Sequence, residues 1–332
     1  MIPEGLFSPL SNKNIKKLLL GAIAFVVIAI IINNNIENNN KKLTIEVSGK
    51  TEEVKAVNNI ALAKESLEKN SIGNKENNTV EQVKPLVSAE EYLVGNIETG
   101  EIYIAKNTKK IFPIASISKL ITALLVNNVL KPDQEITITN KMLEPYSDAG
   151  HLSPGEVYSP MELLYPLLLE SSNDAAEAIA ESYGYDDFIY EMNSIVYEIG
   201  MENTSFSDPS GLSYMNKSNA EDLFVLAKYI FNYDKLILNI TKKVDMITST
   251  TTGHGEQVYK NINPFSLESN FIGGKTGRTN EAKESMLSLF NYKNGDKSYN
   301  IAIIVLRSEF NERENDTKAL LKLFMEKVQK SI

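Results

Sequence analysis

Two residues in "PIASISKL", positions 113–120, have the types and spacing of a nucleophile and its base. Ser116 and Lys119 are three positions apart, so on a helix they lie on the same side with Cβ atoms about 5–6 Å apart. A lysine shielded from water by apolar neighbours holds its proton less firmly and can accept the serine proton. Free backbone N–H groups in the first helical turn could also stabilise an oxyanion. The alternative is a surface serine beside a solvent-exposed lysine.

A second polar group, Ser171 and Asn173, lies between two helical segments in "LLYPLLLESSNDAAEAIAE". Both side chains could project from a short loop into a cleft. The alternative is structural, because polar residues between buried helices often serve as caps, with Asn173 or Asp174 at the N-cap of the second helix. This segment alone does not decide between the two.

The third group, Lys275 and Thr276, lies in "FIGGKTGRT", which has the pattern of a strand. Alternation would turn these two side chains to opposite faces unless the glycines twist the strand. The glycine pair favours close approach by another backbone or by a ligand. A lysine and a hydroxyl on such an edge suit an anionic, peptide-like substrate, whereas a hairpin strand with a solvated lysine is the alternative.

The composition narrows the chemistry that these residues could carry out. The chain has 332 residues, of which 42% are hydrophobic and 23% charged, as in an ordinary globular protein. Its net charge of −9 repels phosphate backbones, so we expect no nucleic acid partner. There is no cysteine, which excludes disulfides, thiolate zinc sites and cysteine nucleophiles. The only histidines are His151 and His254, which favours lysine as the base.

The elements that must position these residues form an α+β pattern. Two strands on either side of Glu98–Gly100 read as a hairpin, and a mainly helical insertion follows over about 115–240. Three strands and a final helix come last. We expect the N- and C-terminal strands to share one antiparallel sheet flanked by helices.

Apolar periodicity identifies two of the helices. One begins near Ala115 and is buried, and the other closes the chain with one apolar stripe that favours packing on the preceding strands over binding a membrane. The residues that set these patterns are Ile117, Leu120, Ile121, Leu124 and Leu125 in the first, and Leu320, Leu323, Phe324 and Val328 in the second.

The N-terminal part of the chain has a different character. Residues 18–32 are unbroken apolar and span roughly 22 Å as a helix, so they could form a signal-peptide core or a short membrane anchor. Lys13, Lys16 and Lys17 precede the run, and no cleavage pattern follows it, which favours an uncleaved anchor within 1–33 with the rest of the chain outside the cell membrane. Residues 34–86 are rich in Asn, Lys and Glu and read as a stalk.

Ser-x-x-Lys, Ser-x-Asn and Lys-Thr-Gly, in this order, form the motif set of the penicillin-recognising serine enzymes. The surrounding segments resemble the low-molecular-mass penicillin-binding proteins that are serine-type D-alanyl-D-alanine carboxypeptidases. The resemblance runs from about 87 to 330 and implies a β-lactamase/transpeptidase-like fold, with a serine peptidase domain over 87–332. It rests on "PIASISKLITALL", "GEVYSPMELLYPLLLESSNDAAEAIAE", "GMENTSFSDPSGLS", "SNAEDLFVLAKYIF" and "GGKTGRT".

The resemblance also implies catalytic roles. Ser116 would attack the penultimate peptide carbonyl of a peptidoglycan stem peptide, with Lys119 as its general base. Ser171 would relay a proton to the leaving D-alanine, and Asn173 would hold the substrate backbone and orient Lys119. Water would then hydrolyse the acyl-enzyme. No metal or cofactor is implied, and β-lactams would be covalent inhibitors.

Substrate binding would fall to the Lys-Thr-Gly segment. Lys275 would supply positive potential, Thr276 would help to bind the terminal carboxylate, and Gly277 completes the motif. The backbone N–H groups of Ser116 and Arg278 would form the oxyanion hole.

The chain departs from the family pattern in three places. Ile262 stands where an arginine can help to bind the substrate carboxylate, and Arg278 could replace that arginine only if its side chain points inward. Ala282-Lys283 stands where the family usually has Ala-Gly, which leaves the local strand shape open. The second β-domain and membrane-binding tail of many relatives are absent, so the N-terminal run would provide the anchoring.

Three other functions share parts of this pattern. A class A β-lactamase needs a loop glutamate in a Glu-x-x-Leu-Asn setting, and no such segment lies between 174 and 274. A D,D-endopeptidase acting on peptidoglycan cross-links remains an alternative, because the same residues cut either bond. A non-catalytic, membrane-tethered peptidoglycan-binding module is disfavoured, since it has no need of a desolvated lysine beside a serine.

Overall fold

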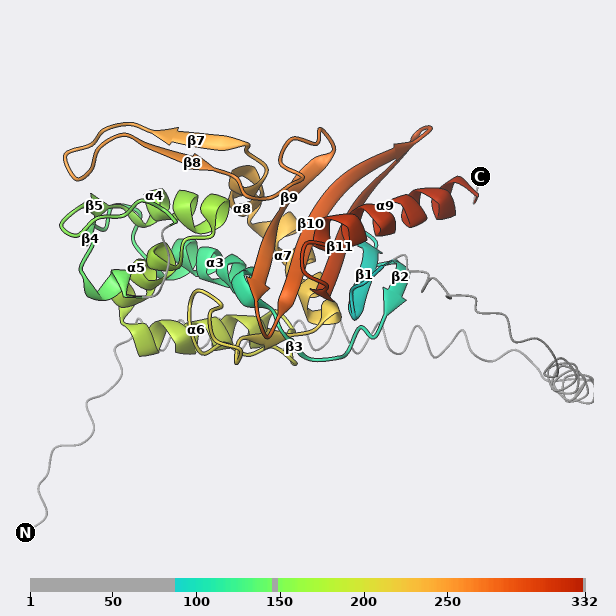
Figure 1. Ribbon diagram of the computed structural model, residues 1–332, viewed down its shortest axis with the longest axis horizontal. Helices are drawn as coiled ribbons and strands as arrows, with labels where there is room; N and C mark the ends of the chain where they lie inside the picture. Colours follow the sequence, from blue (N-terminus) through green and yellow to red (C-terminus); the bar gives the residue numbers. More distant parts are fainter. Residues whose placement is uncertain (1–86, 145–148, 331–332) are drawn as a thin grey trace, which may run out of the picture. The chain divides into compact units, whose positions relative to one another are not determined.

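A computed structural model describes residues 87–144 and 149–330 of the chain (Figure 1). The expected anchor in 1–33 and the stalk in 34–86 lie outside the described residues. Among the helices of the described ranges, none is long and apolar enough to cross a membrane.

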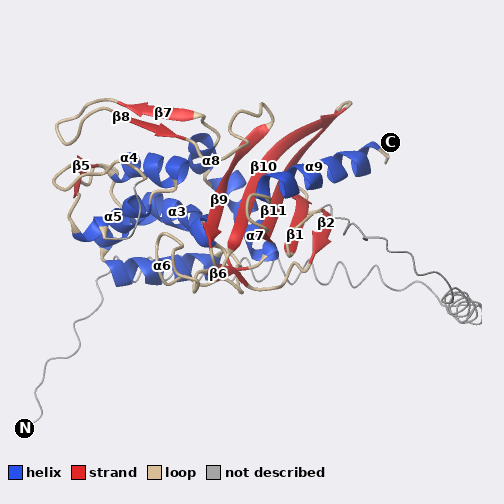
Figure 2. Ribbon diagram, in the orientation of Figure 1, coloured by secondary structure: helices blue, strands red, loops and turns tan. Residues whose placement is uncertain are grey.

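The first and last strands of the described residues share one five-stranded antiparallel sheet with the order β2-β1-β11-β10-β9 (Figure 2). The strands are β1 (Glu91–Asn96), β2 (Ile102–Lys106), β9 (Phe271–Thr279), β10 (Lys283–Asn294) and β11 (Lys297–Ser308). β1 lies between β2 and β11, with Val94 opposite Ile303. The predicted sharing of one sheet by the first and last strands is therefore confirmed, and β9 forms one edge of it.

Both faces of this sheet are covered. Along β11 the side chains alternate, so that Ile301 and Ile303 join one apolar cluster while Ala302 and Ile304 join the other. The first cluster is closed by α9 (Arg313–Gln329), as the sequence predicts, because that helix packs on the strands. Its buried stripe is Leu320, Phe324 and Val328, and Leu323 is half-buried.

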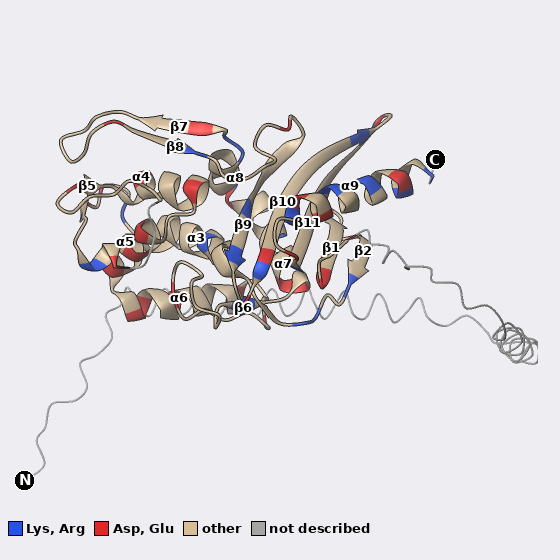
Figure 3. Cartoon of the chain, in the orientation of Figure 1, with Lys and Arg blue, Asp and Glu red and all other residues tan. Residues whose placement is uncertain are grey.

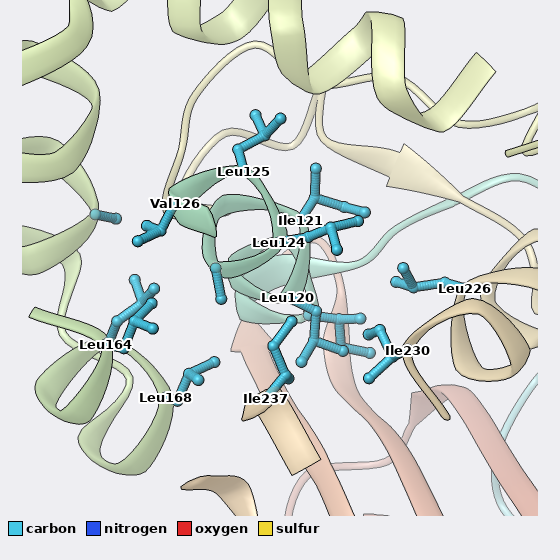
Figure 4. Packing of buried hydrophobic residues seen from close by; sticks show 14 of the residues in the cluster. Leu120, Ile121, Leu124, Leu125, Val126, Leu164, Leu168, Leu226, Ile230 and Ile237 are labelled. Carbon is cyan, nitrogen blue, oxygen red and sulfur yellow. The ribbon is translucent and has the colours of Figure 1, made fainter. Parts of the chain in front are cut away.

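The larger cluster lies between the sheet and the helical insertion. Its centre is α3 (Lys119–Val129), whose apolar residues contact α4, α7 and α8 (Figure 4). The helices of the insertion are α3, α4 (Pro160–Tyr165), α5 (Asn173–Tyr183), α6 (Tyr185–Glu198), α7 (Ala220–Tyr233) and α8 (Lys235–Thr241), with 3-10 turns at Ala115–Ser118 and Lys141–Leu143 and a π-helical turn at Pro166–Glu170. The predicted helical insertion and the buried helix beginning near Ala115 are confirmed.

Three small antiparallel pairs were not predicted. They are β3 (Phe112–Pro113) with β6 (Lys217–Ser218), β4 (Ile136–Thr137) with β5 (Val157–Tyr158), and β7 (Asp245–Thr248) with β8 (Gln257–Lys260). Strands of two to four residues are too short to show a period-2 pattern in a sequence.

Candidate active site

Ser116 lies in the second position of the 3-10 turn that precedes α3. The residue before it, Ala115, has a left-handed backbone with φ of +49°, and the Ser118 hydroxyl donates to the Ala115 carbonyl at 2.8 Å. Glycine backbone lies directly against this turn, because a Cβ added to Gly211 would lie 2.1 Å from the Ala115 carbonyl oxygen. The turn is thus fixed from several sides while Ser116 itself stays partly exposed.

Lys119, at the start of α3, is completely buried. Its Nζ lies 3.0 Å from Ser116 Oγ, 2.7 Å from Asn173 Oδ1 and 2.6 Å from the Ser210 carbonyl oxygen. Burial lowers the pKa of Lys119 to about 7, although nearby carboxylates, first that of Asp208, oppose the shift. The alternative of a solvent-exposed lysine is wrong.

The three contacts of Lys119 suit both charge states, because an ammonium donates to all three oxygens and a neutral amine donates to two of them and leaves a lone pair for the serine. A neutral lysine has two N–H groups and one lone pair. The Asn173 carboxamide oxygen and the Ser210 carbonyl oxygen can only accept hydrogen bonds, so they take both N–H groups. The lone pair then faces the Ser116 hydroxyl, as proton transfer from serine to lysine requires.

The Ser-x-Asn segment joins two helices of different geometry. A capping box between Ser159 and Glu162 starts α4, and the π-helical turn carries the chain to Ser171, which has φ of +64°. Ser172, and neither Asn173 nor Asp174 as the structural alternative proposed, holds the N-cap of α5, because its hydroxyl accepts from Ala175 N–H at 3.1 Å.

Lys275 is the second buried lysine of the site, and 1% of it is exposed. Its Nζ donates to Ser171 Oγ at 2.8 Å and to the Thr276 carbonyl oxygen at 3.0 Å. Burial holds the pKa of Lys275 well below its ordinary value, and the positive charges of Lys119 and Arg313 lower it further. The alternative of a solvated lysine is wrong here too, and Thr276 is equally buried.

The two glycines before Lys275 allow other backbones to approach β9, as predicted. A Cβ on Gly274 would lie 2.3 Å from the Leu287 carbonyl oxygen of β10. Gly273 has φ of +151°, and a Cβ there would lie 2.6 Å from Thr241 Oγ1 at the end of α8. The glycines therefore bring β9 against both its neighbours.

One residue of the Ser-x-Asn segment contacts each lysine. Asn173 contacts Lys119, which contacts Ser116, while Ser171 contacts Lys275. Figure 3 shows basic positions on α3 and β9, the elements that carry the two lysines. The structure thus brings the three motifs together in one site.

The Arg278 side chain turns away from the lysines. Its guanidinium lies 3.4 Å from Glu284, 3.5 Å from Asn311 Oδ1 and 5.1 Å from the centre of the Phe310 ring. It is more than half exposed, beside a hollow lined by Leu212, Arg278, Thr279, Asn280, Glu281 and Phe310. In this position it does not take the place of the arginine that Ile262 replaces.

Two of the three departures from the family pattern have clear local structures. Ile262 is 50% exposed, and its N–H donates to the Leu169 carbonyl at 3.0 Å, so it lies beside the segment that leads to Ser171. Lys283 has φ of +52° and begins β10, and the β10–β11 register shifts just after it. Lys283 therefore adopts the left-handed backbone conformation that glycine favours, at the position where the family usually has glycine.

Sequence reasoning missed the loop that supports the Ser116 turn. The Asp208 carboxylate accepts from the N–H groups of Ser210, Gly211 and Ser213 at 2.6–2.8 Å. Asn216 Nδ2 donates to Ser118 Oγ at 3.1 Å, which ties the same loop to the turn. "SDPSGL" is a turn signal, but nothing in it indicates which helix the turn supports.

Comparisons with known proteins show which family the chain is similar to. The family model described as D-alanyl-D-alanine carboxypeptidase, Peptidase_S11, matches residues 76–306. A D-alanyl-D-alanine endopeptidase of Haemophilus influenzae is 31% identical over 71% of this chain and 82% of its own length. A D-alanyl-D-alanine carboxypeptidase of Bacillus subtilis is 29% identical over 56% of this chain and 50% of its own. The crystal structure of a Streptomyces DD-transpeptidase superposes with a TM-score of 0.64 at 25% identity, covering 72% of this chain and 97% of that one.

Proposed function

The chain belongs to the D-alanyl-D-alanine carboxypeptidase family of serine peptidases, and we propose that Ser116 attacks the peptide bond between the last two D-alanines of a peptidoglycan stem peptide. The observation that carries this proposal is the 3.0 Å contact between Ser116 Oγ and the buried Nζ of Lys119. Burial lowers the pKa of Lys119 to about 7, so the neutral form that can accept a proton is accessible near neutral pH.

Acylation follows from this geometry. The Ser116 proton moves to Lys119 as Oγ bonds to the carbonyl carbon, and the carbonyl becomes an oxyanion. The N–H groups of Ser116 and Arg278 stabilise that oxyanion. A Cβ on Gly277 would lie 3.2 Å from the Ser116 nitrogen, so only glycine lets β9 approach the nucleophile this closely.

Collapse of the tetrahedral intermediate breaks the C–N bond and releases D-alanine. The proton that Lys119 took from Ser116 passes through the Ser171 hydroxyl, which Lys275 holds in place at 2.8 Å, to the leaving amine, and Lys119 is neutral again. Water then attacks the ester as Lys119 takes its proton, and that proton returns to Ser116 Oγ when the C–O bond breaks and the shortened peptide leaves.

Lys275 and Thr276 bind the substrate carboxylate in this proposal. A carboxylate beside Lys275 favours the charged lysine and so offsets the burial that lowers its pKa. Both residues are almost fully buried, so the anion would be recognised by groups with fixed positions.

Endopeptidase activity on D-alanyl cross-links is the second candidate. It is favoured by the relatives from Haemophilus influenzae and Escherichia coli, both named D-alanyl-D-alanine endopeptidases and both 31% identical to this chain. The bond and the nucleophile are alike in the two reactions, and the group that leaves differs.

One experiment tests both candidates. Separate samples of the protein are incubated with a penicillin, with a pentapeptide stem and with a cross-linked dimer, and the intact mass of the first and the products of the other two are measured. We expect one adduct on Ser116, none in Ser116→Ala, and D-alanine from the pentapeptide. Cleavage of the dimer alone would identify an endopeptidase. A folded protein that forms no adduct would favour the non-catalytic binding module.

The location of the protein is a further part of the proposal. We infer that residues 1–33 anchor the chain in the cell membrane by a single span, that 34–86 form a stalk, and that the peptidase domain over 87–332 lies outside. The support is the apolar run at 18–32 and the lysines that precede it.

A further inference from the structure

Arg313, the first residue of α9, contacts the backbone of the Lys-Thr-Gly strand. Its Nη1 donates to the Gly277 carbonyl oxygen at 3.1 Å, and 20% of its side chain is exposed. That carbonyl belongs to the same peptide group as the N–H of Arg278. A trans peptide points its C=O and N–H in opposite directions, and no described peptide bond is cis. Holding the carbonyl therefore sets the direction of the Arg278 N–H.

The Ser116 turn also lies against Gly277. A Cβ on Gly277 would lie 3.1 Å from Ala115 Cβ and 3.2 Å from the Ser116 nitrogen. The nucleophile and the guanidinium of Arg313 thus both contact the backbone of one residue. A rotation of this peptide group would change the aim of one oxyanion donor relative to the other.

A buried carboxylate lies near Arg313. Glu284 is 2% exposed, and its Oε1 lies 4.0 Å from Arg313 Nη1 and 3.4 Å from Arg278 Nη1. Its Oε2 accepts from the Asn311 N–H at 3.0 Å. The negative charge of Glu284 thus lies close to both guanidinium groups, that of Arg278 and that of the arginine that binds the adjoining carbonyl.

We propose that Arg313 is a positioning residue for the oxyanion hole, which acts by fixing and polarising the Gly277–Arg278 peptide group. This proposal rests on the proposed function. A hydrogen bond from a charged donor is stronger than one from a neutral donor, and it polarises the peptide that accepts it. The Arg278 N–H then donates more strongly to the oxyanion, and it is already aimed before charge develops there. Arg313 contacts no reacting atom.

The test compares ground-state binding with transition-state binding. Arg313→Met should lower kcat for D-alanine release by about 10-fold, less than the 10²–10³-fold typical of a lost oxyanion donor, with KM little changed. A peptide boronic acid forms a tetrahedral, anionic adduct with a serine, and its affinity should fall by the same factor. The Arg313→Gln variant keeps a neutral donor and should show a smaller loss in the same direction.

Arg307→Met is the matched control. Arg307 also donates to a backbone carbonyl, that of Glu281, and its Nε contacts Glu90 at 2.9 Å, but it has no contact with the Gly277–Arg278 peptide. We expect wild-type kcat and boronate affinity in this variant, whatever its melting temperature.

Three outcomes would overturn the proposal. The first is a folded Arg313 variant that keeps the wild-type kcat and boronate affinity. The second is an equal loss of kcat and boronate affinity in the Arg313 and Arg307 variants, which would mean that the effect comes from fold stability. If the wild-type protein formed no adduct with a penicillin, the proposed function would fail first and this proposal with it.

Discussion

Lys119 and Lys275 are both buried in one site, yet their contacts suit different tasks. Lys119 makes two hydrogen bonds to groups that can only accept, and a third to the nucleophile. Lys275 contacts a hydroxyl and the carbonyl of the next residue. The contacts around each lysine, and not burial alone, favour Lys119 as the base.

A change at Lys119 tests this assignment. Lys119→Arg keeps the charge but cannot lose its proton in a protein. The acylation rate with a penicillin should fall by roughly 10²–10⁴, the contribution of a general base, while circular dichroism shows an intact fold. A variant that acylated at near wild-type rate would mean that the base lies elsewhere.

The pH dependence of the wild-type protein tests the same residue. The base must be neutral, and burial lowers the pKa of Lys119 to about 7. The acylation rate should therefore rise with pH through an apparent pKa near that value, which belongs to the coupled lysines and not to one alone. Stopped-flow acylation from pH 5 to 10 measures it, and a rate that rises only near pH 10 would contradict the assignment.

At the scale of elements, the sequence predicts helices and strands that are long enough to show apolar periodicity, and it does not predict shorter ones. The strands around Val94 and Ile303 and the helix after Ser116 show full periods of apolar residues, so their types could be predicted. Two-residue strands show no period, and the N-cap at Ser172 depends on which of four adjacent polar residues turns toward α5.

Most residues of the candidate site could be predicted because they lie in short sequence motifs. The sequence shows Ser116 and Lys119 together in one motif and Lys275 in a second one. Asp208 and Arg313 were missed because each acts on a backbone group of another segment. Only the fold shows which backbone that is.

The packing of β9 against the Ser116 turn allows a prediction at Gly277. In Gly277→Ala the new Cβ would lie 2.7 Å from the Ile114 carbonyl oxygen, so strand and turn must separate. We expect a loss of more than 10-fold in acylation and about 1–3 kcal/mol in the free energy of unfolding. Gly255→Ala is the control, since nothing lies within 4 Å of a Cβ there. Unchanged acylation in Gly277→Ala would contradict the close approach.

β1 is joined to α7 by a buried carboxyl group. Glu91 is completely buried and accepts from the Ala220 N–H at the start of α7, and burial raises its pKa to about 8. The folded protein therefore binds this proton more tightly than the unfolded chain, whose glutamates titrate near 4.5. Its contribution to stability is complete below pH 4.5 and is lost as the pH rises through 8.

Replacement of Glu91 tests this dependence. Glutamine cannot ionise, so Glu91→Gln should not lose stability as the pH rises through 8. Its melting temperature should therefore fall less than that of the wild type between pH 5 and 9. The control is Glu101→Gln at an exposed position of the same hairpin, which should follow the wild type. Parallel pH curves for Glu91→Gln and the wild type would contradict the prediction.

At the scale of the whole molecule, the proposed anchor has a direct test. If residues 18–32 remain in the membrane, the mature protein should keep Met1 or Ile2 and fractionate with membranes. Mass mapping of the N-terminus and membrane flotation measure both. An N-terminus between about 33 and 45 would instead indicate a cleaved signal.

The place of β1 in the sheet has a consequence for how the chain folds. Leu93 pairs with Ile304, about two hundred residues later in the chain. The hairpin of β1 and β2 therefore cannot complete its pairing until β11 has been synthesised. The chain loses the entropy of closing this long loop before the strand pairing can stabilise it, and this slows folding. Until β11 and α9 have been made, Val94 of β1 lacks the apolar cluster in which it is buried. A ribosome-bound chain that ends before β11 should therefore be protease-sensitive and unable to bind penicillin, although all three motifs have already been synthesised.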